Sequence, residues 1–305
     1  MNWIDYQSKI EPIDHPILKQ KKINFSILRE DLIHPSISGN KYRKLKYNLI
    51  KAKELGYTKI ITFGGAYSNH IAATAAAANL NTMECIGFIR GEEVEKLIDS
   101  NPTLCFAKNQ GMEFKFLSRE AYRLKDTPEF IQALKQQYPE YYIIPEGGTN
   151  DLAIQGCEEI LHSACNEYQY ICCAVGTGGT ITGLINSSLK EQTVLGFPAL
   201  KGEFFSEEIC KLTIKRNFQL MTSYHFGGYG KVSEELVIFI NSFKSQTNIQ
   251  LDPIYTGKMV YGLFDLIEKD FFPFHTTILA IHTGGLQGIE GINKQLKKKN
   301  KTIIQ

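Results

Sequence analysis

The sequence predicts an α/β fold in which parallel sheets are covered by helices. Apolar, β-branched runs alternate with helical patterns along the chain, which is typical of consecutive βαβ units. Glycine-rich turns follow several of the apolar runs. The 305 residues suffice for one large domain or two ordinary ones, so the chain can bury a substantial core.

The individual elements follow from their periodicity. Strands are expected at residues 59–63, 85–89, 113–117, 141–145, 170–175, 193–197, 218–224 and 276–281. Helices are expected at residues 71–80, 127–137, 153–167, 233–245 and 261–269, and another helix is expected to begin at Lys41. Ligands of open α/β sheets bind beyond the carboxyl ends of the strands, so the turns that follow the strands are expected to converge on one site.

Composition excludes several classes of partner. The 34 Lys and Arg residues balance 32 Asp and Glu residues, and a net charge of +2 spread along the chain predicts no nucleic-acid partner. The lysine-rich run at residues 297–301 is interpreted as a solvated helix face. The N-terminal residues lack an apolar secretory core, and no apolar run is long enough to cross a membrane, so a cytoplasmic protein is expected. The seven cysteines have no paired C-x-x-C spacing, which favours free buried thiols over a metal or redox site.

The most informative turn is AVGTGGTITGL, residues 174–184, which joins an apolar strand to a helix. Its glycines let backbone N–H groups form an anion nest, and its threonines add hydroxyls at the helix N-terminus. The turn is neither a P-loop nor a dinucleotide motif, because Ile181 stands where a third glycine would be required. A phosphate would fit this turn, and a plain strand-to-helix connection is the alternative. The members of the nest are Gly176, Thr177, Gly178, Gly179 and Thr180.

Lys41 is the candidate nucleophile. It follows the turn Gly39-Asn40 and opens a helix, so its amine could be held over a pocket. Desolvation and nearby positive charge would lower its pKa enough for Schiff-base chemistry. The alternative is an ordinary solvated lysine, and spacing alone favours that alternative.

A run of polar side chains, Tyr67, Ser68, Asn69 and His70, stands at the carboxyl end of a predicted strand. Ser68 or Asn69 could serve simply as a helix N-cap. The position of the run at a strand end makes it a candidate part of the substrate pocket.

Six blocks in order, SGNKYRKL, GGAYSNH, PEGGTN, AVGTGGT, DPIYTGK and HTGG, resemble one family of enzymes. The resemblance is to the 1-aminocyclopropane-1-carboxylate (ACC) deaminase and D-cysteine desulfhydrase family, which depends on pyridoxal 5'-phosphate and has the tryptophan synthase β-like fold, fold type II. It runs from about residue 29 to residue 288. It implies two open, twisted, mainly parallel sheets, with a large domain at residues 1–46 and 150–305 and a small inserted domain at residues 47–149. It also implies a homodimer.

The resemblance assigns roles to the candidate residues. Lys41 would carry the cofactor, the nest from Gly176 to Thr180 would hold its phosphate, and Asn69 would bind its 3-hydroxyl. Ser68 would hold the substrate carboxylate, with Asn69, His70 and Tyr67 beside it. Tyr255 would stand against cofactor and substrate with Tyr229 as its companion, although either tyrosine could be a core residue.

Three positions bear on the reaction. Thr256 in YTGK and Thr283 in HTGG resemble the desulfhydrases, whereas ACC deaminases resemble YEGK and HLGG at these places. A neutral hydroxyl near the ring nitrogen suits elimination of a good leaving group better than opening of a carbon ring. Tyr67 departs from the glutamine that is typical of both branches and is expected to reshape the carboxylate side of the pocket.

The sequence therefore predicts a pyridoxal-phosphate dependent lyase or deaminase that acts on a small amino acid. D-Cysteine desulfhydrase-like α,β-elimination to pyruvate, ammonia and sulfide is the favoured reaction, with ACC deamination as the alternative within the family. A non-catalytic protein that binds a phosphate ligand through the nest is the alternative outside it. No metal site is expected.

Overall fold

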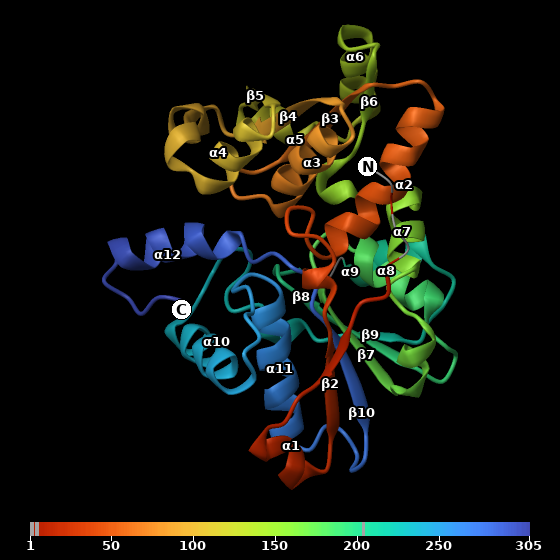
Figure 1. Cartoon of the computed structure of the whole chain (residues 1–305), viewed down its shortest axis with the longest axis vertical. Coiled ribbons are helices and arrows are strands. Elements are labelled where there is room, and N and C mark those ends of the chain that lie inside the picture. Colours follow the sequence, from red (N-terminus) through yellow and green to blue (C-terminus); the bar gives the residue numbers. More distant parts are fainter. Residues whose placement is uncertain (1–2, 4–5, 203–204) are drawn as a thin grey trace.

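The computed structural model describes residue 3, residues 6–202 and residues 205–305, and it shows two sheets with helices packed on them (Figure 1). Both chain ends contribute to the larger sheet, which lies in the lower half of Figure 1. The smaller sheet is formed by the middle of the chain and lies above it. The predicted fold class of two open, mainly parallel sheets is confirmed.

The larger sheet has the strand order β1-β2-β10-β7-β8-β9. Only the edge strand β1 is antiparallel to its neighbour, and the other pairs are parallel. Its strands are β1 (Ile10–Pro12), β2 (Asn24–Leu28), β7 (Tyr170–Val175), β8 (Thr193–Pro198), β9 (Phe218–Leu220) and β10 (Thr277–Ile281).

The smaller sheet is wholly parallel and has the order β5-β4-β3-β6. Its strands are β3 (Lys59–Gly64), β4 (Glu84–Arg90), β5 (Met112–Leu117) and β6 (Tyr141–Ile143). All four lie inside the segment predicted to form the small domain, whereas α2 crosses its predicted limit at residues 46 and 47. The domain limits stay a prediction.

Polar caps start many of the helices. Ser68, Thr127 and Ser233 each accept a hydrogen bond from a backbone N–H three residues further on, which satisfies a donor that the first helical turn leaves free. The helices are α1 (Pro16–Lys21), α2 (Asn40–Glu54), α3 (Asn69–Leu80), α4 (Pro102–Asn109), α5 (Arg119–Arg123), α6 (Pro128–Gln137), α7 (Asp151–Glu158), α8 (Gly179–Ser187), α9 (Phe205–Leu212), α10 (Glu234–Thr247), α11 (Thr256–Glu268) and α12 (Gly288–Lys298).

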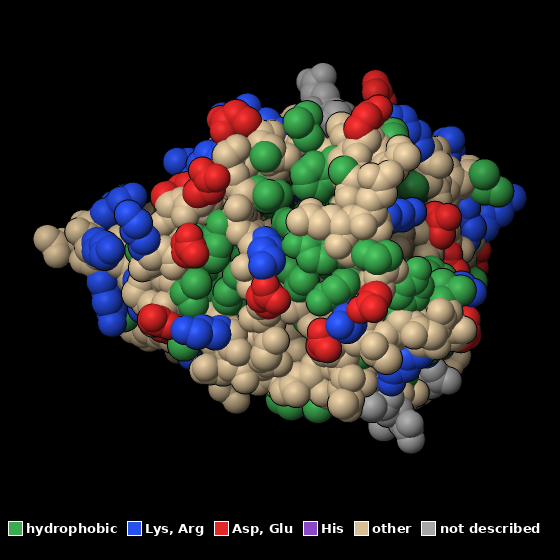
Figure 2. All heavy atoms as spheres, turned by 90° about the horizontal axis from the view of Figure 1, so that it is seen from above, with side chains coloured by type: hydrophobic (Ala, Val, Ile, Leu, Met, Phe, Trp, Pro, Cys, Tyr) green, Lys and Arg blue, Asp and Glu red, His purple; other side chains and the backbone are tan. Residues whose placement is uncertain are grey.

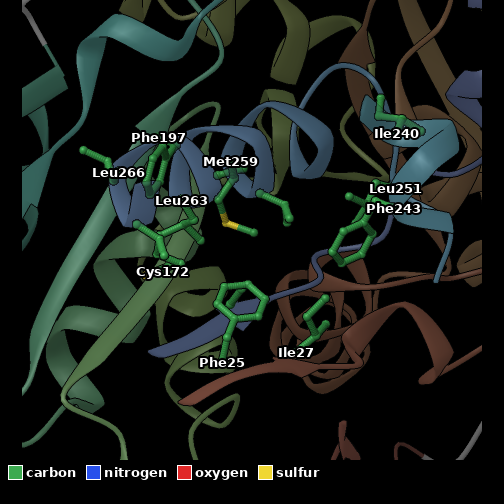
Figure 3. Close-up of a cluster of buried hydrophobic side chains, with 14 of the residues drawn as sticks. Phe25, Ile27, Cys172, Phe197, Ile240, Phe243, Leu251, Met259, Leu263 and Leu266 are labelled. Carbon is green, nitrogen blue, oxygen red and sulfur yellow. The ribbon is translucent and has the colours of Figure 1, made fainter. Parts of the chain in front are cut away.

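The main core lies between the larger sheet and the helices α10 and α11 (Figure 3). Met259 and Leu263 of α11 point toward Phe25 of β2, and all three side chains are buried. The smaller sheet and the helices packed on it form the smaller lobe of the protein. In this lobe α3 packs closely against α2 through a face that consists largely of alanine. Small side chains allow close approach of the two helices, so the polar start of α3 has a fixed position.

The eight predicted strands and the predicted helices are present, with several differences in their limits. The helix expected at residues 261–269 begins earlier, at Thr256, and α1, α4, α5 and α9 were not predicted. The strand expected to reach residue 224 ends at Leu220 and is followed by a 3-10 turn at Thr222–Tyr224. The helix expected at residues 153–167 ends at Glu158. The extended backbone of His162 separates it from a 3-10 turn at Ser163–Glu167. The short strands β1 and β2 were not predicted.

Within the described ranges, no helix has the length and apolar character needed to cross a membrane. Nor does any group of three or more His, Cys, Asp or Glu side chains in the same ranges have the arrangement of a metal site. The face seen in Figure 2 has acidic and basic side chains interspersed around apolar ones, and basic side chains gather at its left end. That end corresponds to the C-terminal turn of α12 (Figure 1), where residues 297–301 are exposed.

Candidate active site

A cavity of about 740 Å³ lies where the turns of the two sheets meet. Its walls come from the turns after β3, β6, β7 and β10 and from the first turn of α2. The convergence predicted for the glycine-rich turns is therefore present. All but one of the sequence-predicted site residues line the cavity or, like Gly179, border it, and the exception is Thr256.

The turn that carries Lys41 is fixed against the turn after β10. Gly39 has φ +63°, and a Cβ atom there would lie 2.0 Å from the backbone oxygen of Thr283, so only glycine fits. The Asn40 N–H donates to the same oxygen at 3.2 Å, and the Asn40 side-chain amide donates to the Thr180 hydroxyl at 2.8 Å. These contacts hold the start of α2 between the nest and the turn after β10.

The Lys41 side chain lines the cavity and is not on the solvated surface of the protein. Its ammonium donates to the Asn40 side-chain oxygen at 3.2 Å. Burial lowers the pKa of Lys41 to about 7, and the positive charge of Lys44 adds to this effect. A large fraction of the amine is therefore neutral at physiological pH, as nucleophilic attack on an aldehyde requires.

The glycine nest has the conformation that anion binding needs. Gly178 is left-handed with φ +86°, and α8 begins at the next residue, so consecutive N–H groups turn toward the cavity. A Cβ atom at Gly179 would lie 3.0 Å from Thr149 and 3.2 Å from the Lys44 ammonium. Glycine at this position lets the two sides of the site approach each other.

Lys44 is a site residue that sequence reasoning missed. Its ammonium is 3.2 Å from the Gly147 oxygen, 3.1 Å from the Thr149 hydroxyl and 3.3 Å from the Thr177 hydroxyl. No carboxylate of the described residues pairs with it, although its side chain is buried, and burial lowers its pKa. The nest was expected to bind an anion through backbone N–H groups and threonine hydroxyls, without a lysine, and the structure places a buried ammonium beside it. The spacing of three residues from Lys41 could have revealed it, since such residues share a helix face.

The start of α3 supplies polar groups from the other lobe. Ser68 caps the helix by accepting from the Ile71 N–H at 3.4 Å, so the plain capping role is present as well. The side-chain oxygen of Asn69 is buried and has no hydrogen-bond partner among the described residues. A buried acceptor without a donor indicates that a bound group completes the site.

His70 is a buried wall of the cavity. Its Nε2 is 2.7 Å from the Thr62 hydroxyl, which donates its own proton to the Ile144 backbone oxygen at 3.0 Å. Nε2 must therefore carry the proton that His70 donates. Burial and the charges of Lys41 and Lys44 hold its pKa well below the ordinary value, so His70 is neutral.

Tyr255 and Tyr229 both line the cavity, and Tyr255 also packs against the main core. Their ring centroids are 6.2 Å apart in an edge-to-face arrangement, and Tyr229 is 45% exposed. A Cβ atom at Gly176 would lie 3.2 Å from the Tyr255 ring, which places that ring beside the nest. Burial raises the pKa of both phenols, so each offers a neutral hydroxyl at physiological pH.

Thr256 is the sequence-predicted site residue that does not line the cavity in this structure. This residue is fully buried, donates to Asp252 Oδ1 at 2.7 Å and accepts from the Asp252 N–H at 3.0 Å. The Asp252 carboxylate also accepts from the N–H groups of Ile254, Tyr255 and Thr256, so it caps α11. Thr256 belongs to this hydrogen-bond network, and its place beside the cofactor ring stays a prediction. Thr283 remains the threonine of the predicted pair that lines the cavity.

Tyr67 and Arg90 line the cavity and are both exposed to solvent. The Tyr67 ring is so close to Gly291 of α12 that a Cβ atom there would lie 2.6 Å from it. Tyr67 therefore spans from the smaller lobe to the last helix of the larger one. Arg90, at the end of β4, has no carboxylate partner among the described residues and lies over the Tyr122 ring at 5.8 Å. Arg90 was not anticipated from the sequence.

These features fit pyridoxal 5'-phosphate. The nest and the Lys44 ammonium would hold its phosphate, and the Asn69 oxygen, which has no partner in the described part of the chain, would accept a hydrogen bond from its hydroxyl. Lys41 would supply an amine with a lowered pKa. Comparisons with known proteins agree. A family model described as "Pyridoxal-phosphate dependent enzyme" matches residues 12–284, so the chain belongs to that family.

Within it, the chain belongs to the group of ACC deaminases and D-cysteine desulfhydrases. It is 32% identical over 299 residues to a putative ACC deaminase of Pyrococcus abyssi, covering 90% of this chain and 88% of that protein. It is 30% identical to the bifunctional D-cysteine desulfhydrase/ACC deaminase, mitochondrial, of Arabidopsis thaliana, covering 86% of this chain and 72% of that protein. The crystal structure of an ACC deaminase homologue superposes with a TM-score of 0.83 at 28% identity, covering 97% of this chain and 95% of that one. The chain is an enzyme, and the non-catalytic alternative is not retained.

Proposed function

We propose that this enzyme catalyses α,β-elimination from a small amino acid, in the manner of a D-cysteine desulfhydrase. The observation that carries the proposal is the absence of a free carboxylate at the cavity. Among the described lining residues Glu146 is the one acid, and it pairs with Lys125 at 3.1 Å. The protic side chain on the turn after β10 is the neutral hydroxyl of Thr283. A neutral partner for the ring nitrogen favours loss of a good leaving group over opening of a carbon ring.

Pyridoxal phosphate, when bound, supplies the electron sink that weakens the bonds at the α-carbon of an amino acid. Lys44, the nest and Asn69 would hold it, and Lys41 would carry it. The start of α3, with Ser68, would bind the substrate carboxylate, because N–H groups at a helix N-terminus attract anions. Arg90 adds positive charge at the opening and attracts the anionic group of an incoming substrate.

The bond changes balance without any further reactant except water. The α-C–H bond breaks and its proton passes to a base, for which the Lys41 amine with its pKa of about 7 is suited. The electron pair forms the Cα–Cβ double bond as the C–S bond breaks, and hydrosulfide leaves. Hydrolysis of the released 2-aminoacrylate gives pyruvate and ammonia. The neutral hydroxyls of Tyr229 and Tyr255 stand beside this cavity and can donate to the leaving sulfur.

The test is a comparison of kcat/KM for D-cysteine and for ACC on one preparation, since the ratio measures differential binding of the two transition states. The kcat/KM for D-cysteine, measured as pyruvate and sulfide, should be well above the kcat/KM for ACC, measured as 2-oxobutyrate. A ratio that favours ACC would identify the enzyme as a deaminase and contradict the proposal.

We propose further that the enzyme works as a homodimer, as the resemblance implies. Sedimentation equilibrium of the cofactor-loaded enzyme tests this proposal. A mass of one chain at micromolar concentration would contradict it.

A further inference from the structure

Lys258, in the first turn of α11, binds two carbonyl groups of one loop. Its ammonium donates to the His225 oxygen and to the Gly228 oxygen, each at 2.9 Å. The side chain is 2% exposed, and no carboxylate of the described residues forms an ion pair with it. A buried cation with carbonyl ligands costs desolvation energy, so its retention calls for a specific role.

The loop at residues 225–230 depends on those bonds for its shape. Four of its residues have left-handed backbones, namely Phe226 at φ +53°, Gly227 at +91°, Gly228 at +115° and Gly230 at +67°. It connects a 3-10 turn to α10 without regular structure of its own. Its backbone hydrogen bonds are short-range, such as the Gly228 N–H donating to the His225 oxygen at 3.0 Å. Its aromatic rings contact α11, where the Phe226 and Tyr261 ring centroids are 4.9 Å apart.

The same loop presents Tyr229 to the cavity. Tyr229 follows Gly228 directly, and its ring reaches Tyr255, which precedes Lys258 by three residues. The N-terminal end of α11 therefore controls both tyrosines, since it carries Tyr255 itself and ties down the loop of Tyr229 through Lys258.

We propose that Lys258 is a positioning residue that fixes Tyr229 at the cavity by ordering the loop at residues 225–230. This inference rests on the proposed function, in which Tyr229 contacts the substrate. It assigns a role to a buried lysine that touches neither substrate nor cofactor.

The test compares Lys258→Met with a matched control, Lys215→Met, in the cofactor-loaded enzyme. Lys215 also donates to two carbonyls, those of Asn186 at 2.8 Å and Ser188 at 2.6 Å, and it lies outside the cavity lining. Hydrogen exchange of the Gly227 and Gly228 amides should be about tenfold faster in Lys258→Met and unchanged in Lys215→Met. The exchange rates in Lys258→Gln, which keeps an N–H donor on a shorter side chain, should lie between those of Lys258→Met and the wild type. Lys258→Gln replaces Lys258→Met in the test if Lys258→Met does not fold.

A double-mutant cycle connects the loop to the reaction. If Lys258 acts through Tyr229, kcat/KM of the double variant Lys258→Met, Tyr229→Phe should fall no further than that of Tyr229→Phe alone. Unchanged amide exchange at the loop, or losses that multiply, would overturn the proposal. A Tyr229→Phe variant with wild-type kcat/KM, while exchange still responds to Lys258→Met, would contradict the role of Tyr229 and therefore the positioning role too. Failure of the D-cysteine assignment would leave the exchange result untouched.

Discussion

Replacement of Lys44 by methionine should raise or preserve the stability of the cofactor-free protein. The same replacement should weaken cofactor binding. The ammonium is buried, and its hydrogen-bond partners are all neutral oxygens. Burial lowers its pKa, which means that the charged form is disfavoured when no anion is bound. Methionine has a similar length and no charge. The free energy of unfolding of the cofactor-free protein should therefore change by less than about 1 kcal/mol or rise.

The loss should appear in cofactor affinity. A hydrogen bond between an ammonium and a phosphate contributes about 1.5–3 kcal/mol, which is about 10- to 150-fold in Kd. The assay is titration of cofactor-free protein with pyridoxal phosphate, followed by visible absorbance, beside urea unfolding of the same preparation. Lys46→Met is the matched control, because Lys46 on the same helix is 2.9 Å from both Glu159 carboxylate oxygens. That variant should lose stability and keep its cofactor affinity.

Two results would refute this reasoning about Lys44. One is a Lys44→Met variant with wild-type cofactor affinity, which would mean that the buried cation does not face the phosphate. The other is a loss of several kcal/mol in the cofactor-free protein, which would mean that the ammonium is held by its neutral partners for structural reasons.

Five further predictions concern single residues. The pKa of Lys41 is about 7, so the rate of covalent capture of pyridoxal phosphate should level off above about pH 7; a rate that climbs steadily toward the ordinary lysine pKa would contradict this. The lowered pKa also makes the contribution of Lys41 to stability rise with pH from about 7 toward 10.5, and Lys41→Met should abolish that rise in urea unfolding. Gly39→Ala should weaken cofactor binding at least about tenfold in the absorbance titration, because its Cβ atom would meet the Thr283 oxygen at 2.0 Å; unchanged affinity would count against the fixed turn. Tyr67→Ala should raise kcat/KM for longer amino acids relative to D-cysteine by about tenfold, and an unchanged ratio would show that this ring does not limit the pocket. Leu263→Ala in the main core should cost about 2–5 kcal/mol in urea unfolding, whereas a loss under about 1 kcal/mol would contradict its tight packing.

The parts of the fold that sequence could predict are those with local causes. The strand β7, the glycine turn after it and the helix α8 follow from a run of apolar residues, three glycines and a helical pattern within one short segment. The short strands β1 and β2 were missed because their strand character depends on pairing with each other and, through β2, with β10 at the far end of the chain.

Sequence motifs predicted which residues lie near the cavity. They could not predict the contacts that depend on the direction in which a side chain points. Resemblance predicts Thr256 near the cofactor ring, but it could not show that the Thr256 hydroxyl donates to Asp252, four residues back. Lys258 was missed because spacing cannot distinguish a buried lysine from a solvated one. The environment of Lys44 was missed because its neutral partners lie more than a hundred positions away in the sequence. Tyr67 was recognised as a departure from the family, yet its packing on Gly291 joins residues more than two hundred positions apart and needs the folded structure.

The central claim is that the cavity between the two sheets holds the cofactor on Lys41. Borohydride reduction of the cofactor-loaded enzyme fixes the cofactor to whichever lysine carries it, and mass mapping of the digested peptides identifies that lysine. A single modified peptide with the label on Lys41 is expected. The Lys41 amine lines the cavity and has a pKa of about 7, whereas the Lys44 ammonium is held by three oxygen atoms. A label on Lys44, Lys258 or any lysine outside the cavity would contradict the account.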